Sequence, residues 1–477
     1  VPALRLARTR PVVALTLRGR ELAVPRPTVR SGLRPLLAIL IIIALVVWQR
    51  ASGLMALGLV TTGVMVLTVA LCAAPLTRLG GVVLAAIWTR AFGPVGRFAG
   101  NHVRQHPARS TLTVATLGLG LGTVLLFGIL AWSFERTLVS RLVASERADM
   151  VISSAFVSGG YRTAPLSERL LDELRAIPGV ALVAGEQSKD VAYAGGVIVL
   201  KACDAACFRD RRLYEWPLES GALPDAMERV ARGEAVLVTT SFARHYGNQP
   251  GEMIELRSPN GLLRLTVAGI SSGAPESAVW MSRERYRTHW NDTALWTANV
   301  ALGDGADYRA VETAIAQRLG AKYRLFIRST EQLIDYFAGE VHQAFSLQYL
   351  LEAVTLILVV IAIGDTLASG VLERTREFGM MRAIGLHRSR LFGIVMLEGA
   401  AIGVRGLGLA TVTGLALGAF WVKVQFPAVV GWDLDLHFPS TFVVSTLGLT
   451  ILLCAAGSLL PALRAARLSA AQALRNE

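Results

Sequence analysis

Charged residues are scarce in this chain. Only 17% of its 477 residues are Asp, Glu, Lys or Arg, whereas 53% are hydrophobic. A typical soluble protein contains about 25% charged residues. The composition therefore excludes a single soluble core and favours a membrane protein.

Cysteine is also scarce, with four residues in the whole chain. Cys72 and Cys454 lie in apolar stretches, and Cys203 and Cys207 lie four residues apart in a more polar segment. A zinc site needs further cysteine or histidine ligands at short spacing, so we expect no metal site. For Cys203 and Cys207 two interpretations stay open, a disulfide that closes a very short loop or two free thiols.

Catalytic signatures are scarce as well. The phosphate-binding pattern G-x-x-x-x-G-K-[ST] does not occur. The histidines of the more polar segment, His245, His289 and His342, stand in no nucleophile motif such as G-x-S-x-G and in no metal motif such as H-E-x-x-H. We therefore predict that the chain is not an enzyme, has no catalytic residue and binds no cofactor itself.

Six apolar stretches approach or exceed the roughly 20 helical residues that cross a bilayer. They predict an α-helical polytopic membrane protein with about six transmembrane helices and an α+β extracytoplasmic domain. The predicted parts are a cytoplasmic N-terminal segment (1–32), a transmembrane hairpin (33–74), a cytoplasmic or interfacial linker (75–110), a transmembrane helix (111–133), the extracytoplasmic domain with helical stalks (134–345), a transmembrane helix (346–371), a cytoplasmic segment (372–390), a transmembrane helix (391–422), an external loop (423–440), a transmembrane helix (441–460) and a cytoplasmic tail (461–477).

The net charge of +13 is distributed unevenly. Residues 134–345 contain 24 basic and 26 acidic side chains, whereas the rest of the chain contains 24 basic and 9 acidic ones. Because short cytoplasmic loops are rich in Lys and Arg, residues 134–345 are predicted to lie outside the cell membrane. The basic charge thus reflects topology, and we expect no nucleic-acid partner.

Local patterns predict several elements of the external segment. Helices are expected at 166–177 and 311–319, strands at 235–239 and 323–327, and a helix directly after the first of these strands. A hairpin is expected at 253–270 around Pro259, Asn260 and Gly261. The stretch 331–368 lacks proline, which predicts one continuous helix whose outer part projects from the membrane as a stiff rod.

The two ends of the chain carry nearly the same heptapeptide. P-A-L-R-L-A-R at 2–8 and P-A-L-R-A-A-R at 461–467 agree at six of seven positions. Because the second copy follows a membrane span, the first is expected to follow one too, in a missing first half or a separate chain. A chance match of two low-complexity heptapeptides is the alternative.

The most distinctive motif is a charged run at 373–385, E-R-T-R-E-F-G-M-M-R-A-I-G, between two apolar spans. Phe378, Met381 and Ile384 are spaced three apart and predict an apolar stripe on a short amphipathic helix. Gly379 and Gly385 would allow close approach or end that helix. An ordinary positively charged loop is the alternative interpretation.

This run, the Leu397 and Glu398 pair in the next span and the P-A-x-R-A-A-R end resemble the FtsX-like, MacB-type permease family of ABC transporters. The segments 233–238 and 267–270 are similar to the periplasmic core domain of that family. Within the family, the chain is most similar to the second half of the large two-repeat permeases of the YbbP type. The resemblance implies a multi-pass protein of the cytoplasmic (inner) membrane with its large domain in the periplasm.

The resemblance also implies partners. A dimeric ABC ATPase, carrying ATP and Mg²⁺, would dock on 372–390, and a first permease repeat or second permease chain would complete the membrane part. Membrane lipid is a further expected partner, and an external protein is an open alternative. The residues expected to couple to the ATPase are Glu373, Arg374, Arg376, Glu377, Gly379, Met381, Arg382, Ala383, Gly385 and Arg388.

Three ionisable residues, Asp365, Glu398 and Arg405, are predicted inside membrane spans. Charges are costly in lipid, so each is expected to face protein or water. We predict an ion pair between Asp365 and Arg405, with a proton relay as the functional alternative.

The leading hypothesis is a permease subunit that uses ATP hydrolysis by its partner to extrude or extract a lipophilic or lipid-linked substrate. The alternative is a mechanotransmission subunit that activates an external cell-wall hydrolase or another partner without transport. A third class is a membrane-anchored receptor without an ATPase. The sequence does not identify the substrate.

Overall fold

The computed structural model describes residues 29–467, apart from 53, 106, 155–156, 159–161 and 220. The first copy of the predicted end-to-end repeat lies outside these residues. The described chain forms two compact units. The membrane unit contains the described residues up to Leu126, Leu351–Leu417 and the described residues from Ser440, and the outer unit contains Phe127–Leu350 and Gly418–Pro439.

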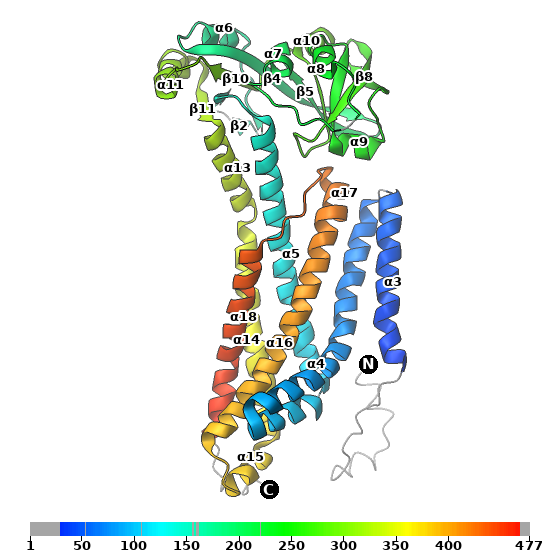
Figure 1. The fold of residues 1–477 in the computed structure, drawn as a ribbon, viewed down its shortest axis with the longest axis vertical. Helices are drawn as coiled ribbons and strands as arrows, with labels where there is room; N and C mark the ends of the chain where they lie inside the picture. Colours follow the sequence, from blue (N-terminus) through cyan, green and yellow to red (C-terminus); the bar gives the residue numbers. More distant parts are fainter. Residues whose placement is uncertain are drawn as a thin grey trace. The chain divides into compact units, whose positions relative to one another are not determined.

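Six helices among the described residues are long and apolar enough to span a membrane, as predicted. Each contains at least 18 residues with high mean hydropathy and few charges, which suits the hydrocarbon core of a bilayer. They are labelled in Figure 1 as α3 (Val29–Ser52), α4 (Met55–Gln105), α5 (Pro107–Ser145), α14 (Ser346–Glu373), α16 (Arg388–Phe420) and α18 (Ser440–Arg467).

Helix α4 is much longer than a membrane span because it turns back at Gly93. This residue has φ 58° and ψ −131°, a conformation that glycine adopts without steric cost. After the turn, Gly100 packs so closely on Ala85 that an added Cβ would stand 2.6 Å from the Ala85 Cβ. Trp88 and Ala99 then pack with apolar residues of α16. The predicted linker at 75–110 is thus helical in its described residues.

The prediction of one continuous helix over 331–368 is wrong at Phe345. Helix α13 (Thr330–Ala344) ends there, and α14 begins at Ser346. Phe345 has φ −92° and ψ 5°, and its ring lies 6.2 Å from that of Phe134. Because a tertiary contact rather than proline or glycine accompanies the break, local propensity could not reveal it.

A mixed sheet of nine strands organises the outer unit (Figure 1). The strand order is β11-β1-β10-β4-β5-β9-β6-β8-β7, in which β5 and β9, and β6 and β8, pair in parallel and the other neighbours pair antiparallel. The strands are β1 (Met150–Ser154), β4 (Val180–Tyr193), β5 (Gly196–Cys203), β6 (Ala235–Thr239), β7 (Met253–Ser258), β8 (Gly261–Ser271), β9 (Ala278–Ser282), β10 (Thr297–Leu302) and β11 (Leu325–Ser329). A small separate pair is formed by β2 (Val157–Ser158) and β3 (Arg162–Thr163).

Alternating burial explains how these strands pack. In β7, Ile254 and Leu256 are buried while Met253 and Glu255 are exposed, which is the period of a half-buried strand. The predicted hairpin is observed between β7 and β8, where Gly261 has φ 113° after a two-residue turn. The predicted helix at 166–177 appears as α6 (Arg169–Arg175), the helix after β6 as α9 (Thr240–Tyr246), and the helix at 311–319 as α11 (Tyr308–Ile315) followed by η1 (Ala316–Gly320). The strand predicted at 323–327 is β11 at Leu325–Ser329, and Tyr323 lies in α12 (Ala321–Tyr323) instead. The helices of this unit are α6 (Arg169–Arg175), α7 (Ala205–Arg209), α8 (Ala226–Ala231), α9 (Thr240–Tyr246), α10 (Arg283–Trp290), α11 (Tyr308–Ile315), η1 (Ala316–Gly320) and α12 (Ala321–Tyr323).

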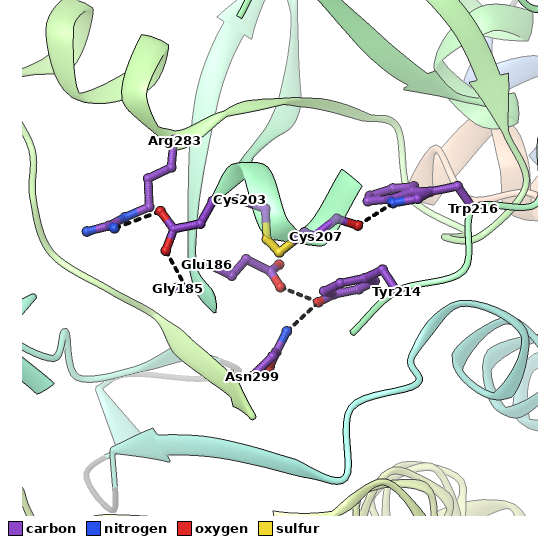
Figure 2. The surroundings of a disulfide bond; sticks show 9 residues. Gly185, Glu186, Cys203, Cys207, Tyr214, Trp216, Arg283 and Asn299 are labelled. Atoms are coloured by element: carbon purple, nitrogen blue, oxygen red, sulfur yellow. Dashed lines mark hydrogen bonds and ion pairs between the residues drawn. A yellow bond between two sulfur atoms is a disulfide. The ribbon is translucent and has the colours of Figure 1, made fainter. Parts of the chain in front are cut away.

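Cys203 and Cys207 form a disulfide in the core of the outer unit (Figure 2). Cys203 ends β5, Cys207 lies in α7, and both are fully buried. Trp216 donates its indole N–H to the Cys207 carbonyl at 2.9 Å. Asp204, between the two cysteines, accepts from the buried Arg283 at 3.0 Å. The turn that contains the disulfide is thus also stabilised by hydrogen bonds from the side chains of Trp216 and Arg283.

A cluster of buried and half-buried charged side chains lies where α5 meets the sheet. Glu146, which directly follows α5, is 9% exposed and forms a backbone bridge to Tyr214. Tyr214 donates its hydroxyl to Glu186 at 2.6 Å, and Lys201 binds Glu276 at 2.6 Å. Burial, followed by repulsion from Glu186, raises the pKa of Glu146 to about 8. With three carboxyl groups around one ammonium, the cluster holds a proton at neutral pH.

We expect the outer unit to lose stability as the pH rises. The Glu146 pKa is about 8 in the folded chain against 4.5 for a free glutamate, so between these values the folded state binds more protons. The protonation of Glu146 therefore contributes fully to the free energy of unfolding below pH 4.5. This contribution falls by up to about 1.4 kcal/mol per pH unit as the pH rises towards 8. Glu146→Gln should flatten this slope in thermal unfolding of the detergent-solubilised chain. An unchanged slope would contradict the assignment, and Glu255→Gln, at an exposed carboxylate, serves as the control.

Candidate functional site

The charged run predicted from the sequence forms a short helix, α15 (Thr375–Ala383), and a tight turn. Gly385 follows the helix with φ 99°, which favours glycine. The Leu386 N–H donates to the Met381 carbonyl and the Gly385 N–H to the Arg382 carbonyl, both at 3.0 Å. These bonds satisfy carbonyls at the helix end, so Gly385 ends α15 as predicted.

One side of α15 is anchored in the membrane unit by Phe378. This side chain is fully buried and packs with Val371, Leu391, Val395, Ala462 and Ala465. Gly379 beside it is also buried.

The predicted single apolar stripe is therefore wrong. Phe378 packs inward and Met381 is half-buried against the same cluster, whereas Ile384 is 88% exposed. Ile384 lies past the last turn of α15, where the chain leaves the helix, so the spacing of three no longer keeps it on one face.

Arg374 also points inward, towards Glu398 of α16. Its two terminal nitrogens lie 3.0 and 3.1 Å from the two carboxylate oxygens of Glu398. The side chains are 14% and 9% exposed, so this bidentate pair is largely buried. Arg374 was expected to contact a partner. The structure assigns it to the anchoring of α15 instead, and it gives Glu398 the protein partner that a charge in a membrane span requires.

The other residues of the charged run lie on the surface to different extents. Met381 and Arg382 are half-buried. The exposed ones are Glu373, Arg376, Glu377, Ala383, Gly385 and Arg388.

An open groove of about 760 Å³ adjoins this surface. Ile384 lines it together with Phe98, which is 49% exposed and comes from the returning arm of α4. The groove is completed by Met381, Gly385, Leu386, His387, Ser389 and Arg390. Sequence reasoning missed Phe98, because only the turn at Gly93 brings it to α15.

The predicted ion pair between Asp365 and Arg405 is wrong. Arg405 is 3% exposed and donates to the carbonyls of Ala401 and Thr77 at 2.7 and 3.2 Å. Its side chain passes Gly80, where an added Cβ would stand 3.0 Å from it. Asp365 is exposed on α14. Asp365 lies on α14 and Arg405 on α16, but α14 is rotated so that Asp365 faces away from Arg405.

Among the described residues, no group of three His, Cys, Asp or Glu side chains is arranged to hold a metal ion. The candidate site combines an anchored helix, exposed charges of both signs and an open groove with apolar residues in its lining.

Two family models match the chain. A model of the MacB-like periplasmic core domain matches residues 110–318, and a model of the FtsX-like permease C-terminal domain matches residues 349–470. Together they cover more than half of the chain. The chain belongs to the FtsX-like, MacB-type permeases.

Proteins similar to this permease include other ABC transporter permeases. An uncharacterized ABC transporter permease protein of Mycobacterium tuberculosis is 25% identical over 86% of this chain and 48% of its own length. Macrolide export ATP-binding/permease proteins MacB of Bdellovibrio bacteriovorus and Aeromonas hydrophila are each 26% identical, over 51% and 43% of this chain and 39% and 30% of theirs. The permease thus spans about half or less of the length of these relatives.

A solved structure is also similar to part of the permease. The periplasmic region of MacB from Actinobacillus actinomycetemcomitans is 12% identical with a TM-score of 0.31, covering 40% of this chain and 94% of that one.

The family matches confirm the predicted permease family and the multi-pass inner-membrane location with a periplasmic domain. The outer unit of the permease contains most of the MacB-like match and is thus periplasmic. Because α14 follows that domain and is one candidate membrane span, we expect α15 at the cytoplasmic face.

Proposed function

We propose that the chain is the transmembrane subunit of an ABC transporter and that a separate ATPase docks on α15 and the adjoining groove. The observation that carries this proposal is Ile384, a large apolar side chain that is 88% exposed at the cytoplasmic face. It stands among exposed charges and beside the apolar rim of Phe98. Apolar anchors within a charged rim are typical of protein interfaces.

ATP hydrolysis takes place outside these 477 residues in this proposal. The sequence contains no phosphate-binding loop. Relatives named MacB are described as ATP-binding and permease proteins, and the chain matches only 30% and 39% of two of them. The ATP-binding part therefore belongs to another polypeptide or segment, which receives α15.

The substrate class in this proposal is lipophilic or lipid-linked, extruded across the membrane or extracted from its outer leaflet. Two of the relatives are named for macrolide export, and macrolides are large, mostly apolar molecules. The MacB-like match at 110–318 includes the candidate membrane span Ser110–Ser145, so the chain continues directly from a membrane span into the outer unit.

A second candidate is mechanical signalling to an external protein. Helix α5 favours it, because it runs from Pro107 to Ser145 without interruption and leads from a membrane span directly to the first strand of the sheet. Substrate efflux from proteoliposomes distinguishes the two functions. Efflux driven by ATP supports transport, whereas an ATP-driven movement of the outer unit without any efflux supports signalling.

Replacing Ile384 by Ser tests the docking surface. An exposed isoleucine that becomes buried in an interface contributes about 1.5–3 kcal/mol, so ATPase affinity should fall roughly tenfold to a hundredfold. The measurement is co-purification and titration of the tagged permease with the ABC ATPase that binds the wild-type chain. Val197→Ser, at a 70% exposed position of the periplasmic domain, is the matched control and should bind normally. Wild-type affinity in the Ile384 variant would refute docking at this surface.

A further inference from the structure

A polar cavity of about 260 Å³ lies within the outer unit, where α5 and α9 meet the segment that follows α17 (Phe426–Val430). Its volume exceeds what one water molecule needs by more than tenfold and approaches the roughly 300 Å³ of small ligand sites. Charged side chains of both signs line it, among them Arg141, Arg244, Lys423, Asp433 and Asp435.

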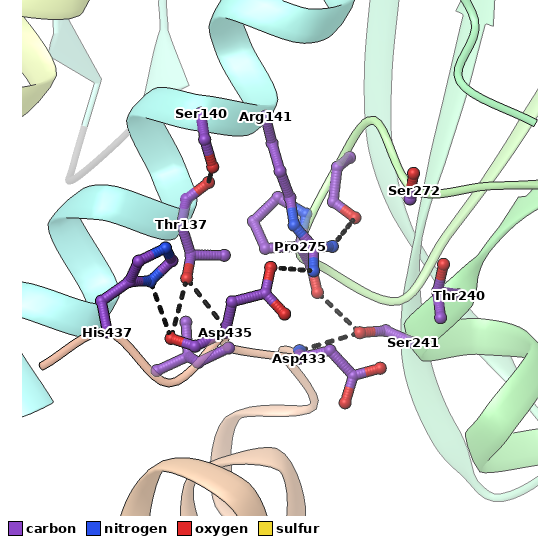
Figure 3. A network of polar contacts seen from close by, with 12 residues as sticks. Thr137, Ser140, Arg141, Thr240, Ser241, Ser272, Pro275, Asp433, Asp435 and His437 are labelled. Atoms are coloured by element: carbon purple, nitrogen blue, oxygen red, sulfur yellow. Dashed lines mark hydrogen bonds and ion pairs between the residues drawn. The ribbon is translucent and has the colours of Figure 1, made fainter.

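Asp433 is held firmly in the wall of this cavity (Figure 3). Its N–H lies 2.9 Å from the Ser241 hydroxyl and 3.1 Å from the Pro275 carbonyl. The residue is only 7% exposed. One carboxylate oxygen, Oδ1, accepts from Arg244 at 2.5 Å, whereas the buried Oδ2 has no partner within the described part of the chain. A buried carboxylate oxygen without a donor is costly, so this atom is suited to a cationic or N–H group of a ligand.

Two cations line the same cavity and are only loosely neutralised. Arg141 and Lys423 lie 3.4 and 3.8 Å from the carboxylate of Asp435, and they donate to the carbonyls of Ala274 and Leu434 at 3.1 and 2.9 Å. Charge-assisted hydrogen bonds are usually about 2.7–2.9 Å long. Because the Asp435 side chain is 57% exposed, it can turn to solvent and leave the remaining N–H groups of both cations to a ligand anion. Glu219 also lines the cavity and accepts from the Thr240 hydroxyl at 2.8 Å. The cavity thus presents the fixed carboxylate of Asp433 opposite two cations that backbone carbonyls bind only in part.

The position of the cavity indicates the source of its ligand. Lys423 lies towards the outer end of the candidate membrane span Arg388–Val430. A molecule that reaches the cavity from the membrane therefore presents a headgroup to it. Cations and a carboxylate in one small cavity select a headgroup that carries both an amine and a phosphate.

We propose that this cavity binds the headgroup of a zwitterionic aminophospholipid, with the ammonium on Asp433 and the phosphate on Arg141 and Lys423. This inference deepens the proposed function, on which it rests for the role of the lipid as transported or extracted molecule. Binding itself requires no ATPase. Failure of lipid binding and failure of ATPase docking at Ile384 are therefore separate results.

The test measures lipid retention by the full chain in native mass spectrometry, after incorporation into nanodiscs with equal amounts of phosphatidylethanolamine and phosphatidylglycerol. The wild-type chain should retain phosphatidylethanolamine preferentially. Asp433→Asn should reduce that retention about tenfold. Asp435→Asn should increase it, because the competing carboxylate is removed. Opposite effects of two neighbouring substitutions are not expected from a purely structural role. Glu255→Gln, at an exposed carboxylate paired with Arg264, is the control.

Three results would overturn the proposal. The first is equal retention of both lipids by the wild-type chain, and the second is a loss of retention in both Asp variants. The third concerns the source of the headgroup and uses free phosphoethanolamine as a soluble probe. Should it bind with the same dependence on Asp433 while no lipid is retained, the ligand is a soluble zwitterion and not a lipid.

Discussion

Arg374→Ala should destabilise the membrane unit by about 3–5 kcal/mol, because it removes the opposite charge and two hydrogen bonds from the buried carboxylate of Glu398. The two side chains form a bidentate pair and are 14% and 9% exposed. Removing one charge of a buried pair costs far more than the pair itself contributes. Thermal unfolding of the detergent-solubilised chain measures the effect.

Replacing both charges tests whether the two side chains act as a pair. Arg374→Met combined with Glu398→Leu leaves no uncompensated charge, so the double variant should regain most of the stability that either single variant loses. Arg376→Ala, at an exposed position of the same run, is the control and should unfold like the wild type. Additive losses in the double variant would show that the two side chains do not act as a pair.

Phe378→Ala should cost about 3–5 kcal/mol, since a fully buried aromatic ring leaves a cavity where α15 packs on α14, α16 and α18. The helix would lose its anchor, so docking of the ATPase should weaken together with stability. Ile384→Ser differs in this respect, because an 88% exposed side chain contributes little to folding.

Stability and ATPase affinity are measured on the same samples, by thermal unfolding and by ATPase titration. Phe326→Ala, at a 44% exposed phenylalanine in β11 of the outer unit, is the matched control and should have nearly wild-type stability and ATPase affinity. Normal stability of the Phe378 variant would contradict the buried anchor.

Much of the fold could be predicted from local patterns. Six apolar segments have the length of membrane helices, and their number follows from the distribution of apolar residues along the sequence. The hairpin at Gly261 and the end of α15 at Gly385 could be predicted because both need a positive φ that glycine supplies. The return of α4 has the same cause at Gly93, which lies between Arg90 and Arg97 in the segment predicted as a linker.

The candidate site could be predicted only in part. The run 373–385 was located by its charge and its family pattern, but its residues divide into an anchor and an outer surface. Arg374 and Phe378 face inward, whereas Glu377 and Ile384 face outward. Helical spacing places residues around an axis and does not say which side meets the neighbouring helices. The partner of Arg374, Glu398, comes from another helix, and the groove residue Phe98 comes from a third.

The sequence by itself determined the family, the multi-pass fold and the periplasmic domain, because these depend on a contiguous motif, on apolar length and on the distribution of charge. It also predicts a cytoplasmic place for the charged run at 373–385. The tertiary structure alone decided which buried charges meet. It pairs Glu398 with Arg374, gives Arg405 two backbone carbonyls, leaves Asp365 exposed and gathers Arg141, Lys423 and Asp433 around one cavity. Those contacts join residues far apart in the chain, and they depend on how each helix is rotated against its neighbours, which no local pattern specifies.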